Sequence, residues 1–456
     1  MLVEFRVANF QCFRDEAVLS LVPAGQDRSL RGNIWAGKRH QALKSAAIFG
    51  PNASGKSSLL RALSVLQRFV TGSATKMTVG DPIPGIDPFR LAPETREQPS
   101  CFEVLVELDG AAFRYRVEAT ASRVIREKLE HQDAAEGSRW LTLIDRDETR
   151  EHTRRAILHY RLGSEARRDQ IIDDTRENAL VLSRAAERSV DPVIPVFQWF
   201  KDRVSSSMGG PIGEYALGTV AELAAKNDEF ATLLSELIRD ADTGIAGLQT
   251  EGTAEIVRHL LSRGAEGKDR EESESREQLL QEILGRFRFY TLHQGASEQL
   301  VRFELEQESE GTRQYLRLVG QMVEHLRDGF LMVVDELDAS LHPQLARRVV
   351  ELAHSPILGS AGAQFIFSTH DTTLMDPALM RRDQIFITQK NAQGASELYS
   401  LWDFERMPRK DAAWAKNYLA GRFGGVPAFG PALADIPQGD EPTKVEWTSP
   451  QAAEAE

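Results

Sequence analysis

Apolar positions in the first third of the chain follow a strand-like pattern. Short runs rich in Val, Leu, Phe and Tyr are separated by stretches rich in Gly and Pro. The runs are residues 2–7, 17–22, 101–108, 112–119, 124–129 and 140–144. Asp109 and Gly110 lie between two of these runs, where an Asp-Gly pair is a strong hairpin signal. Residues 1–150 are therefore expected to contain an antiparallel sheet.

The pattern changes to helical spacing between residues 151 and 285. Apolar side chains then recur at the spacing that places them on one helix face, as in Phe230, Leu233, Leu234, Leu237 and Ile238. Residues 263–278 are charged and almost free of apolar side chains, which predicts either a solvated helix tip or a contact with a partner or nucleic acid. We interpret residues 151–285 as a helical insertion for dimerisation or partner binding.

Strand-like runs return between residues 286 and 429. They are residues 286–292, 300–306, 330–336, 364–371, 384–390 and 396–401. Helical spacing separates them at residues 315–326 and 344–354, and Pro343 suits the first turn of the second helix. Residues 430–456 are rich in Pro, Ala, Asp and Glu, which predicts a disordered acidic tail.

Composition narrows the class of protein. The 456 residues carry a formal net charge of −13, which argues against a globally basic nucleic-acid binder but leaves a local basic patch open. Cys12 and Cys101 have no metal-ligand spacing and are expected to be ordinary thiols in a reducing compartment. No signal peptide and no membrane-spanning run is evident, so we expect a soluble, cytoplasmic protein.

A phosphate-binding loop follows the apolar run at residues 46–49. Residues 50–57 fit the pattern G-x-x-x-x-G-K-[S/T], and leucines at helical spacing follow them. The two glycines let backbone N–H groups point inward, and the next helix adds its positive end. Lys56 is expected to neutralise the β- and γ-phosphates, and the Ser57 hydroxyl to ligate Mg²⁺. The residues expected to bind nucleotide are Gly50, Pro51, Asn52, Ala53, Ser54, Gly55, Lys56, Ser57 and Ser58.

Three polar residues follow later buried runs. Asp335 can hold Mg²⁺, and Glu336 after it can orient or deprotonate an attacking water. His370 can sense the γ-phosphate through a hydrogen bond. The simpler alternatives are a helix N-terminus for the two acids and a structural histidine for His370.

A polar turn at residues 308–312 precedes the helix around 315–326. Ser309, Gly311 and Thr312 would present N–H groups and hydroxyls to an anion, although plain helix capping explains such a turn as well. Near the N-terminus, Arg6, Asn9 and Arg14 have two open interpretations, contacts to the base or ribose and a polar sheet edge.

Taken together, these motifs resemble the ABC-type ATPase heads of SMC, Rad50, RecF and OLD proteins. The resemblance implies an α/β fold: a P-loop head with a mixed central sheet, flanking helices and an antiparallel β subdomain, here carrying a helical insertion. It implies ATP and Mg²⁺ as cofactors, and a second copy whose Ser309, Gly311 and Thr312 contact the γ-phosphate in trans. Asp338 would be the D-loop acid at the interface and His370 the switch histidine. The chain departs from the family pattern at Thr312, where Gln is typical, and a Q-loop is not evident at residues 88–91.

A narrower resemblance, to bacterial RloA-type ATPases, covers nearly the whole chain except the insertion and tail. It includes residues 9–14, 88–91, 309–318, 337–343, 395–401 and 418–427. Such ATPases are encoded in two-gene defence loci, including PARIS-like anti-phage systems, beside a TOPRIM-type or RloB-type effector. The resemblance implies a toxin–antitoxin-like ATPase sensor with a separate nuclease-type partner, with DNA and a phage protein as candidate triggers.

Three other functions are weighed against this one. An OLD-type nuclease needs a large metal-binding domain after the switch histidine, but 86 residues follow His370 and they contain no spaced acidic cluster. An RecF- or SMC-like DNA repair ATPase shares the head and stays the main alternative, although no long heptad arms are present. A transporter subunit is disfavoured by the insertion and the divergent turn at residues 308–312.

Overall fold

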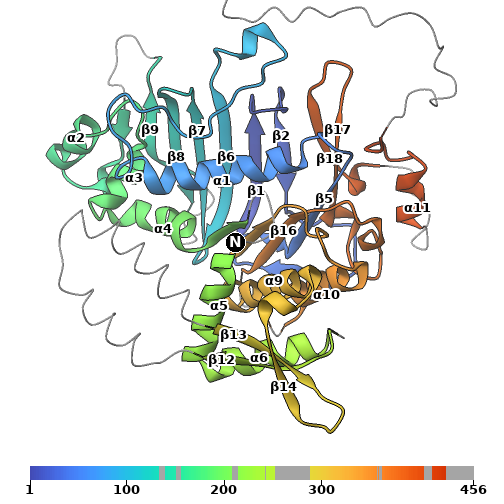
Figure 1. The fold of residues 1–456 in the computed structure, drawn as a ribbon. Coiled ribbons are helices and arrows are strands. Elements are labelled where there is room, and N and C mark those ends of the chain that lie inside the picture. The colour runs from blue at the N-terminus through green and yellow to red at the C-terminus, as the bar shows by residue number, and fades with distance from the viewer. Residues whose placement is uncertain are drawn as a thin grey trace, which may run out of the picture.

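Two β-sheets and the helices packed on them form the frame of the molecule (Figure 1). The computed structural model describes residues 1–132, 139–149, 156–207, 214–241, 243–251, 288–356, 358, 362–404 and 413–427. The charged stretch at 263–278 and the tail from residue 430 lie outside the described residues. None of the described helices combines the length and apolar character that crossing a bilayer requires.

The first sheet is mixed and has six strands. In spatial order they are β11 (Val204–Ser207), β15 (Leu331–Val334), β16 (Gln364–Ser368), β5 (Ser45–Phe49), β17 (Ile385–Lys390) and β18 (Ser396–Ser400). The first five are parallel, and β18 returns antiparallel to β17. The central strands are buried on both faces, which explains why they are continuous apolar runs in the sequence.

Helices cover both faces of this mixed sheet. Ala46 and Ile48 of β5 face the core that contains α1 (Lys56–Gly72), whereas Ala47 and Phe49 face the core that contains α9 (Glu310–Arg327) and α10 (Pro343–His354). The strand that leads into the phosphate-binding loop is therefore anchored in two hydrophobic cores.

The second sheet is antiparallel and has seven strands. In spatial order they are β10 (Ala156–Leu158), β9 (Leu141–Asp147), β8 (Val124–Gln132), β7 (Ala111–Ala119), β6 (Ser100–Leu108), β1 (Leu2–Ala8) and β2 (Ala17–Ser20). Asp109 and Gly110 form the predicted turn between β6 and β7, both with positive φ. One face packs on α1 and on α2 (Glu165–Asp173), α3 (Val181–Glu187) and α4 (Ile194–Asp202). This architecture confirms the predicted α/β fold, with a mixed central sheet, flanking helices and an antiparallel β subdomain.

The described part of residues 151–285 contains more than helices. Its helices include α5 (Glu214–Lys226) and α6 (Asp228–Arg239), and the predicted apolar face of α6 is buried at Phe230, Leu234, Leu237 and Ile238. The sequence did not predict its three strands, β10, β11 and β12 (Ile245–Glu251). β11 extends the mixed sheet, and β12 pairs with β13 (Arg288–Gln294), which pairs with β14 (Leu300–Glu304). These strands tie the region to both lobes.

Shorter elements complete the described chain. They are β3 (Ile34–Ala36), β4 (Gln41–Leu43), α11 (Trp414–Leu419) and the 3-10 turns Arg31–Asn33, Pro93–Thr95, Tyr160–Leu162, Asp191–Val193, Leu305–Gln307, Thr372–Leu374, Arg382–Gln384 and Leu401–Asp403.

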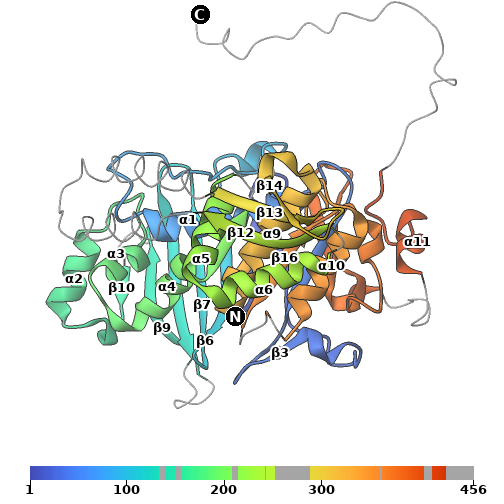
Figure 2. The ribbon, with the colours of Figure 1, turned by 60° about the horizontal axis from the view of Figure 1, so that its bottom comes forward.

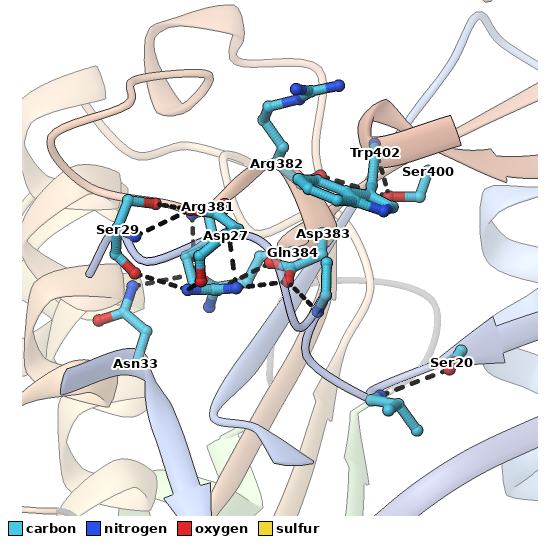
Figure 3. A network of polar contacts seen from close by, with 12 residues as sticks. Ser20, Asp27, Ser29, Asn33, Arg381, Arg382, Asp383, Gln384, Ser400 and Trp402 are labelled. Carbon is cyan, nitrogen blue, oxygen red and sulfur yellow. Dashed lines mark hydrogen bonds and ion pairs between the residues drawn. The ribbon is translucent and has the colours of Figure 1, made fainter. Parts of the chain in front are cut away.

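Hydrogen bonds from the buried Arg381 join the N-terminal region to the segment before β17 (Figure 3). The guanidinium of Arg381 is fully buried and donates to Asp383 Oδ2 at 2.6 Å and to the carbonyl oxygens of Asp27 and Ser29 at 3.2 and 2.5 Å. Asn33 Nδ2 donates to Gln384 Oε1 at 2.9 Å. A buried charge is tolerated when it is paired and hydrogen-bonded in this way.

Candidate nucleotide-binding site

The loop between β5 and α1 has the backbone shape that cradles phosphate. Gly50 and Gly55 have φ of 149° and 115°. A Cβ atom at Gly50 would lie 2.4 Å from the Thr388 carbonyl oxygen, and one at Gly55 would lie 3.0 Å from Cys12 Sγ. Both positions therefore require glycine. Lys56 is 6% exposed, and its Nζ donates to the carbonyl oxygens of Gly50 and Pro51 at 2.9 and 3.1 Å.

Strand β17 supports this loop from behind. Thr388 Oγ1 donates to the Phe49 carbonyl oxygen at 3.2 Å and lies 2.6 Å from Ser54 Oγ, with which it shares a hydrogen bond. Thr388 is fully buried and Ser54 is 2% exposed. Thr388 was not predicted as a site residue from the sequence, although a lone threonine after the apolar residues 385–387 is a usable signal.

The two predicted acids, Asp335 and Glu336, directly follow strand β15. Ser368 ends the neighbouring parallel strand β16, which lies beside β5. Ser368 Oγ donates to Asp335 Oδ1 at 2.5 Å and accepts from the Glu336 backbone N–H at 2.8 Å. Glu336 has a φ of 54°, a left-handed conformation that is uncommon for a non-glycine residue. One hydroxyl, that of Ser368, therefore holds both the Asp335 carboxylate and the Glu336 backbone.

Asp338, three residues after Asp335, is hydrogen-bonded to Thr369 and His370. Its Oδ1 accepts from Thr369 Oγ1 at 2.6 Å and from the His370 backbone N–H at 3.1 Å. The Thr369 N–H in turn donates to the Ile48 carbonyl oxygen at 3.1 Å, at the end of β5. The segment after β15 and the segment after β16 are therefore joined beside the phosphate-binding loop.

The charged and titratable groups of the site shift one another's pKa values. Burial lowers the pKa of Lys56, and the nearby carboxylates of Asp335, Glu336 and Asp338 oppose that shift. Burial, followed by the charge of Lys56, lowers the pKa of His370. The His370 imidazole is therefore neutral at pH 7 and can donate or accept a hydrogen bond there.

The residues at this sheet edge are suited to binding a nucleoside triphosphate with Mg²⁺. The two required glycines and the N-terminus of α1 provide a phosphate cradle, and Lys56 supplies a positive charge inside it. The Ser57 hydroxyl and the Asp335 carboxylate are hard oxygen donors, which Mg²⁺ prefers. The charge and donor chemistry of the site match the group expected from the sequence.

The turn at residues 309–312 lies apart from this cradle. Ser309 caps α9, and its Oγ accepts from the Thr312 N–H at 3.1 Å. A Cβ at Gly311 would lie 2.7 Å from the Ser340 carbonyl oxygen, so glycine lets the turn pack on the segment after Asp338. Ser309 is exposed, and among the described residues no hydrogen bond or ion pair joins the turn to residues 50–58. Within one chain, these residues therefore act as the N-terminal cap of α9, which was the simpler interpretation of the turn.

Polar residues near the N-terminus have structural partners. Arg6 pairs with Glu4 and Glu16, and Arg14 pairs with Asp15. Asn9 is buried.

Asn9 also holds the segment in which a Q-loop was sought. Its Oδ1 accepts from the Phe89 N–H at 3.0 Å, and its Nδ2 donates to the carbonyl oxygens of Thr95 and Gln98, each at 2.9 Å. These contacts favour a structural role for Asn9. They do not identify a Q-loop glutamine in this segment.

Comparison with known proteins finds similar solved structures and a family match. Two solved structures are similar over 88% of this chain: the SMC head bound to the C-winged helix domain of ScpA (13% identity, 97% of that chain, TM-score 0.41) and the SMC head domain from Thermotoga maritima (12% identity, 98% of that chain, TM-score 0.37). No curated protein matches the chain in sequence. Residues 45–376, from β5 to just beyond His370, match the family described as "AAA domain, putative AbiEii toxin, Type IV TA system". The chain belongs to this AAA-domain family of P-loop ATPases.

Proposed function

We propose that this chain is the ATP-binding and ATP-hydrolysing sensor subunit of a bacterial anti-phage defence system. Copies of it assemble through shared ATP sites in the cytoplasm and control a separate nuclease-type effector. The observation that carries the proposal is the separation of two site parts. Lys56, Asp335 and Glu336 gather at one sheet edge, whereas the exposed turn at Ser309 has no partner from that edge within the described chain.

We assign the following roles to the residues of the site. Lys56 would neutralise phosphate charge, and Ser57 and Asp335 would hold Mg²⁺, which would add positive charge beside the phosphates. Glu336, fixed through its backbone by Ser368, orients the attacking water and takes its proton. The neutral imidazole of His370 hydrogen-bonds the γ-phosphate, and Asp338 links this contact to the surface that meets the second copy.

Two lines support a role in defence. The family description names a "putative AbiEii toxin" of a type IV toxin–antitoxin system. The resemblance to RloA-type ATPases adds a separate effector encoded beside the ATPase. An ATP-controlled assembly is suited to this task, because nucleotide binding joins two surfaces and hydrolysis releases them.

The substitution Glu336→Gln tests the proposed hydrolysis. Removing the general base is expected to slow ATP hydrolysis about 100-fold or more while ATP still binds. ATP-bound dimers should then accumulate and be detected by light scattering after gel filtration. The exposed Glu306 provides a matched control, since Glu306→Gln should hydrolyse ATP like the wild type. Wild-type hydrolysis by Glu336→Gln would contradict the assignment.

A phage-challenge assay tests the biological role. Cells that express the chain with its neighbouring reading frames should resist phage, and Lys56→Ala should abolish that resistance. Unchanged protection by Lys56→Ala would contradict ATP-dependent defence. A DNA-damage phenotype without phage protection would instead favour an RecF- or SMC-like repair ATPase.

A further inference from the structure

Glu308, the residue immediately before the exposed turn, contacts strand β13, whereas the turn itself bonds within α9. Glu308 has a side chain that is 9% exposed, and its Oε1 accepts from His293 Nε2 at 2.7 Å and from the Thr291 hydroxyl. Thr291 is fully buried, and both donors lie on β13. A largely buried carboxylate that accepts two hydrogen bonds has a low desolvation cost only while both bonds persist.

Strand β13 is a firm anchor for this contact. It is the central strand of its sheet, with β12 on one side and β14 on the other, and it lies close to α9 (Figure 2). Helix α5 packs on both β13 and α9. The His293 ring meets Phe303 edge-on at 4.7 Å between centroids, which restrains its orientation.

The other contacts of the turn do not involve β13. Glu310 pairs with Arg313 and Arg317 along α9 itself, and Gly311 packs against the Ser340 carbonyl oxygen. Ser309 already caps the helix, so Glu308 is not needed for capping. Glu308 instead fixes where the chain enters α9 relative to β13.

We infer that Glu308, held by Thr291 and His293, is a positioning residue for ATP hydrolysis. It sets the angle at which the first turn of α9 presents Ser309 and Gly311 to the nucleotide on a second copy. This inference rests on the proposed function, because Glu308 acts through a turn that serves another subunit. It predicts that loss of Glu308 impairs turnover without impairing nucleotide binding in the same chain.

The test compares Glu308→Ala, Glu308→Gln and Thr291→Val in the full chain, with Glu306→Ala as the matched exposed control. A small misplacement of a catalytic group is expected to lower kcat about 10-fold in Glu308→Ala. The affinity for a fluorescent ATP analogue, measured at protein concentrations that keep the chain monomeric, should stay unchanged. Glu308→Gln should retain most of the kcat because its amide oxygen still accepts both bonds, and Thr291→Val should lower kcat less than Glu308→Ala.

Two results would overturn the inference while leaving the proposed function intact. The first is wild-type kcat in Glu308→Ala alongside a loss of kcat in Ser309→Arg. The second is a parallel fall of ATP affinity, kcat and Tm in Glu308→Ala and Thr291→Val, which would make the contact structural only. Wild-type kcat in both Glu308→Ala and Ser309→Arg would overturn the shared site itself.

Discussion

Residues 50–57 lie between a buried strand and a buried helix, whereas residues 309–312 lie on the surface at the start of α9. Lys56 is 6% exposed and bonded to its own loop, and Thr388 supports that loop from β17. Ser309 is exposed and bonds within its own turn, to Thr312. Helix α9 itself is well buried, with its apolar side chains in the core shared with α10.

Under the proposed function, this difference separates what one chain does by itself from what requires two copies. The phosphate cradle and the acids after β15 are held by contacts within the fold, so the proposal expects one copy to bind nucleotide. Ser309 is exposed, and the proposal expects its turn to contribute to hydrolysis only when two copies assemble. The following predictions test this division, beginning with the largest expected effect.

The substitution Lys56→Ala removes the charge from the cradle. Charge-assisted hydrogen bonds to two phosphates are lost, so the affinity for ATP is expected to fall about 100-fold. Isothermal titration calorimetry measures this change directly. An affinity near that of the wild type would show that the cradle does not bind the triphosphate.

The substitution Ser309→Arg changes the exposed turn alone. A long charged side chain prevents close approach to a second copy, and the expected fall in ATP hydrolysis is about 100-fold. Calorimetry should show an ATP affinity similar to that of the wild type. A matching loss of affinity would mean that the turn serves the nucleotide of its own chain.

Acid should lower the stability of the fold through His354, which contacts the start of β5. His354 Nε2 lies 2.8 Å from Ser45 Oγ, at the start of β5, and 3.3 Å from Gln384 Nε2, which donates to it. Burial, with a smaller effect from Lys44, lowers the pKa of His354 from 6.5 to about 3. The unfolded chain therefore binds a proton between pH 6.5 and 3 that the folded chain excludes, and stability falls as the pH falls through this window.

By pH 5 the expected loss of unfolding free energy from this histidine is about 2 kcal/mol. Urea unfolding at pH 7 and pH 5 measures it, with His354→Gln as the comparison. The variant should lose less stability than the wild type between the two pH values. Equal losses would contradict the assignment.

The substitution Thr388→Val removes the support behind the cradle with little change in shape. Ser54 then loses a buried hydrogen bond, and ATP affinity is expected to fall about fivefold. Thr388→Ser keeps the hydroxyl and should bind ATP nearly as the wild type does. Equal affinities in all three proteins would show that the loop keeps its shape without Thr388.

Much of the cradle and fold class could be predicted from the sequence because local patterns encode them. The glycine spacing of the loop and the apolar runs that end in Asp335 and Ser368 are local signals, and the structure brings these segments together at one sheet edge. Strand β11 was missed because three of its four residues are serines, and its extended form comes from pairing with β15.

Contacts between residues that are distant in the sequence could not be predicted from local sequence patterns. Thr388 and Ser54 are 334 positions apart, so their hydrogen bond depends on the order of strands in the mixed sheet. The bond from Thr291 to Glu308 likewise depends on how β13 lies beside α9. The pattern at Asn9 allowed a ligand contact or a structural role, and the buried hydrogen bonds to residues 89–98 favour the second.

Mixing two inactive variants tests the shared site most directly. Lys56→Ala lacks the cradle charge and Ser309→Arg lacks the turn, so each is expected to hydrolyse ATP poorly by itself. In a mixed dimer one site carries both defects and the other carries neither. An equimolar mixture should therefore recover about a quarter of the wild-type rate if dimers form at random. A mixture no more active than either variant alone would contradict an ATP site built from two copies of this chain.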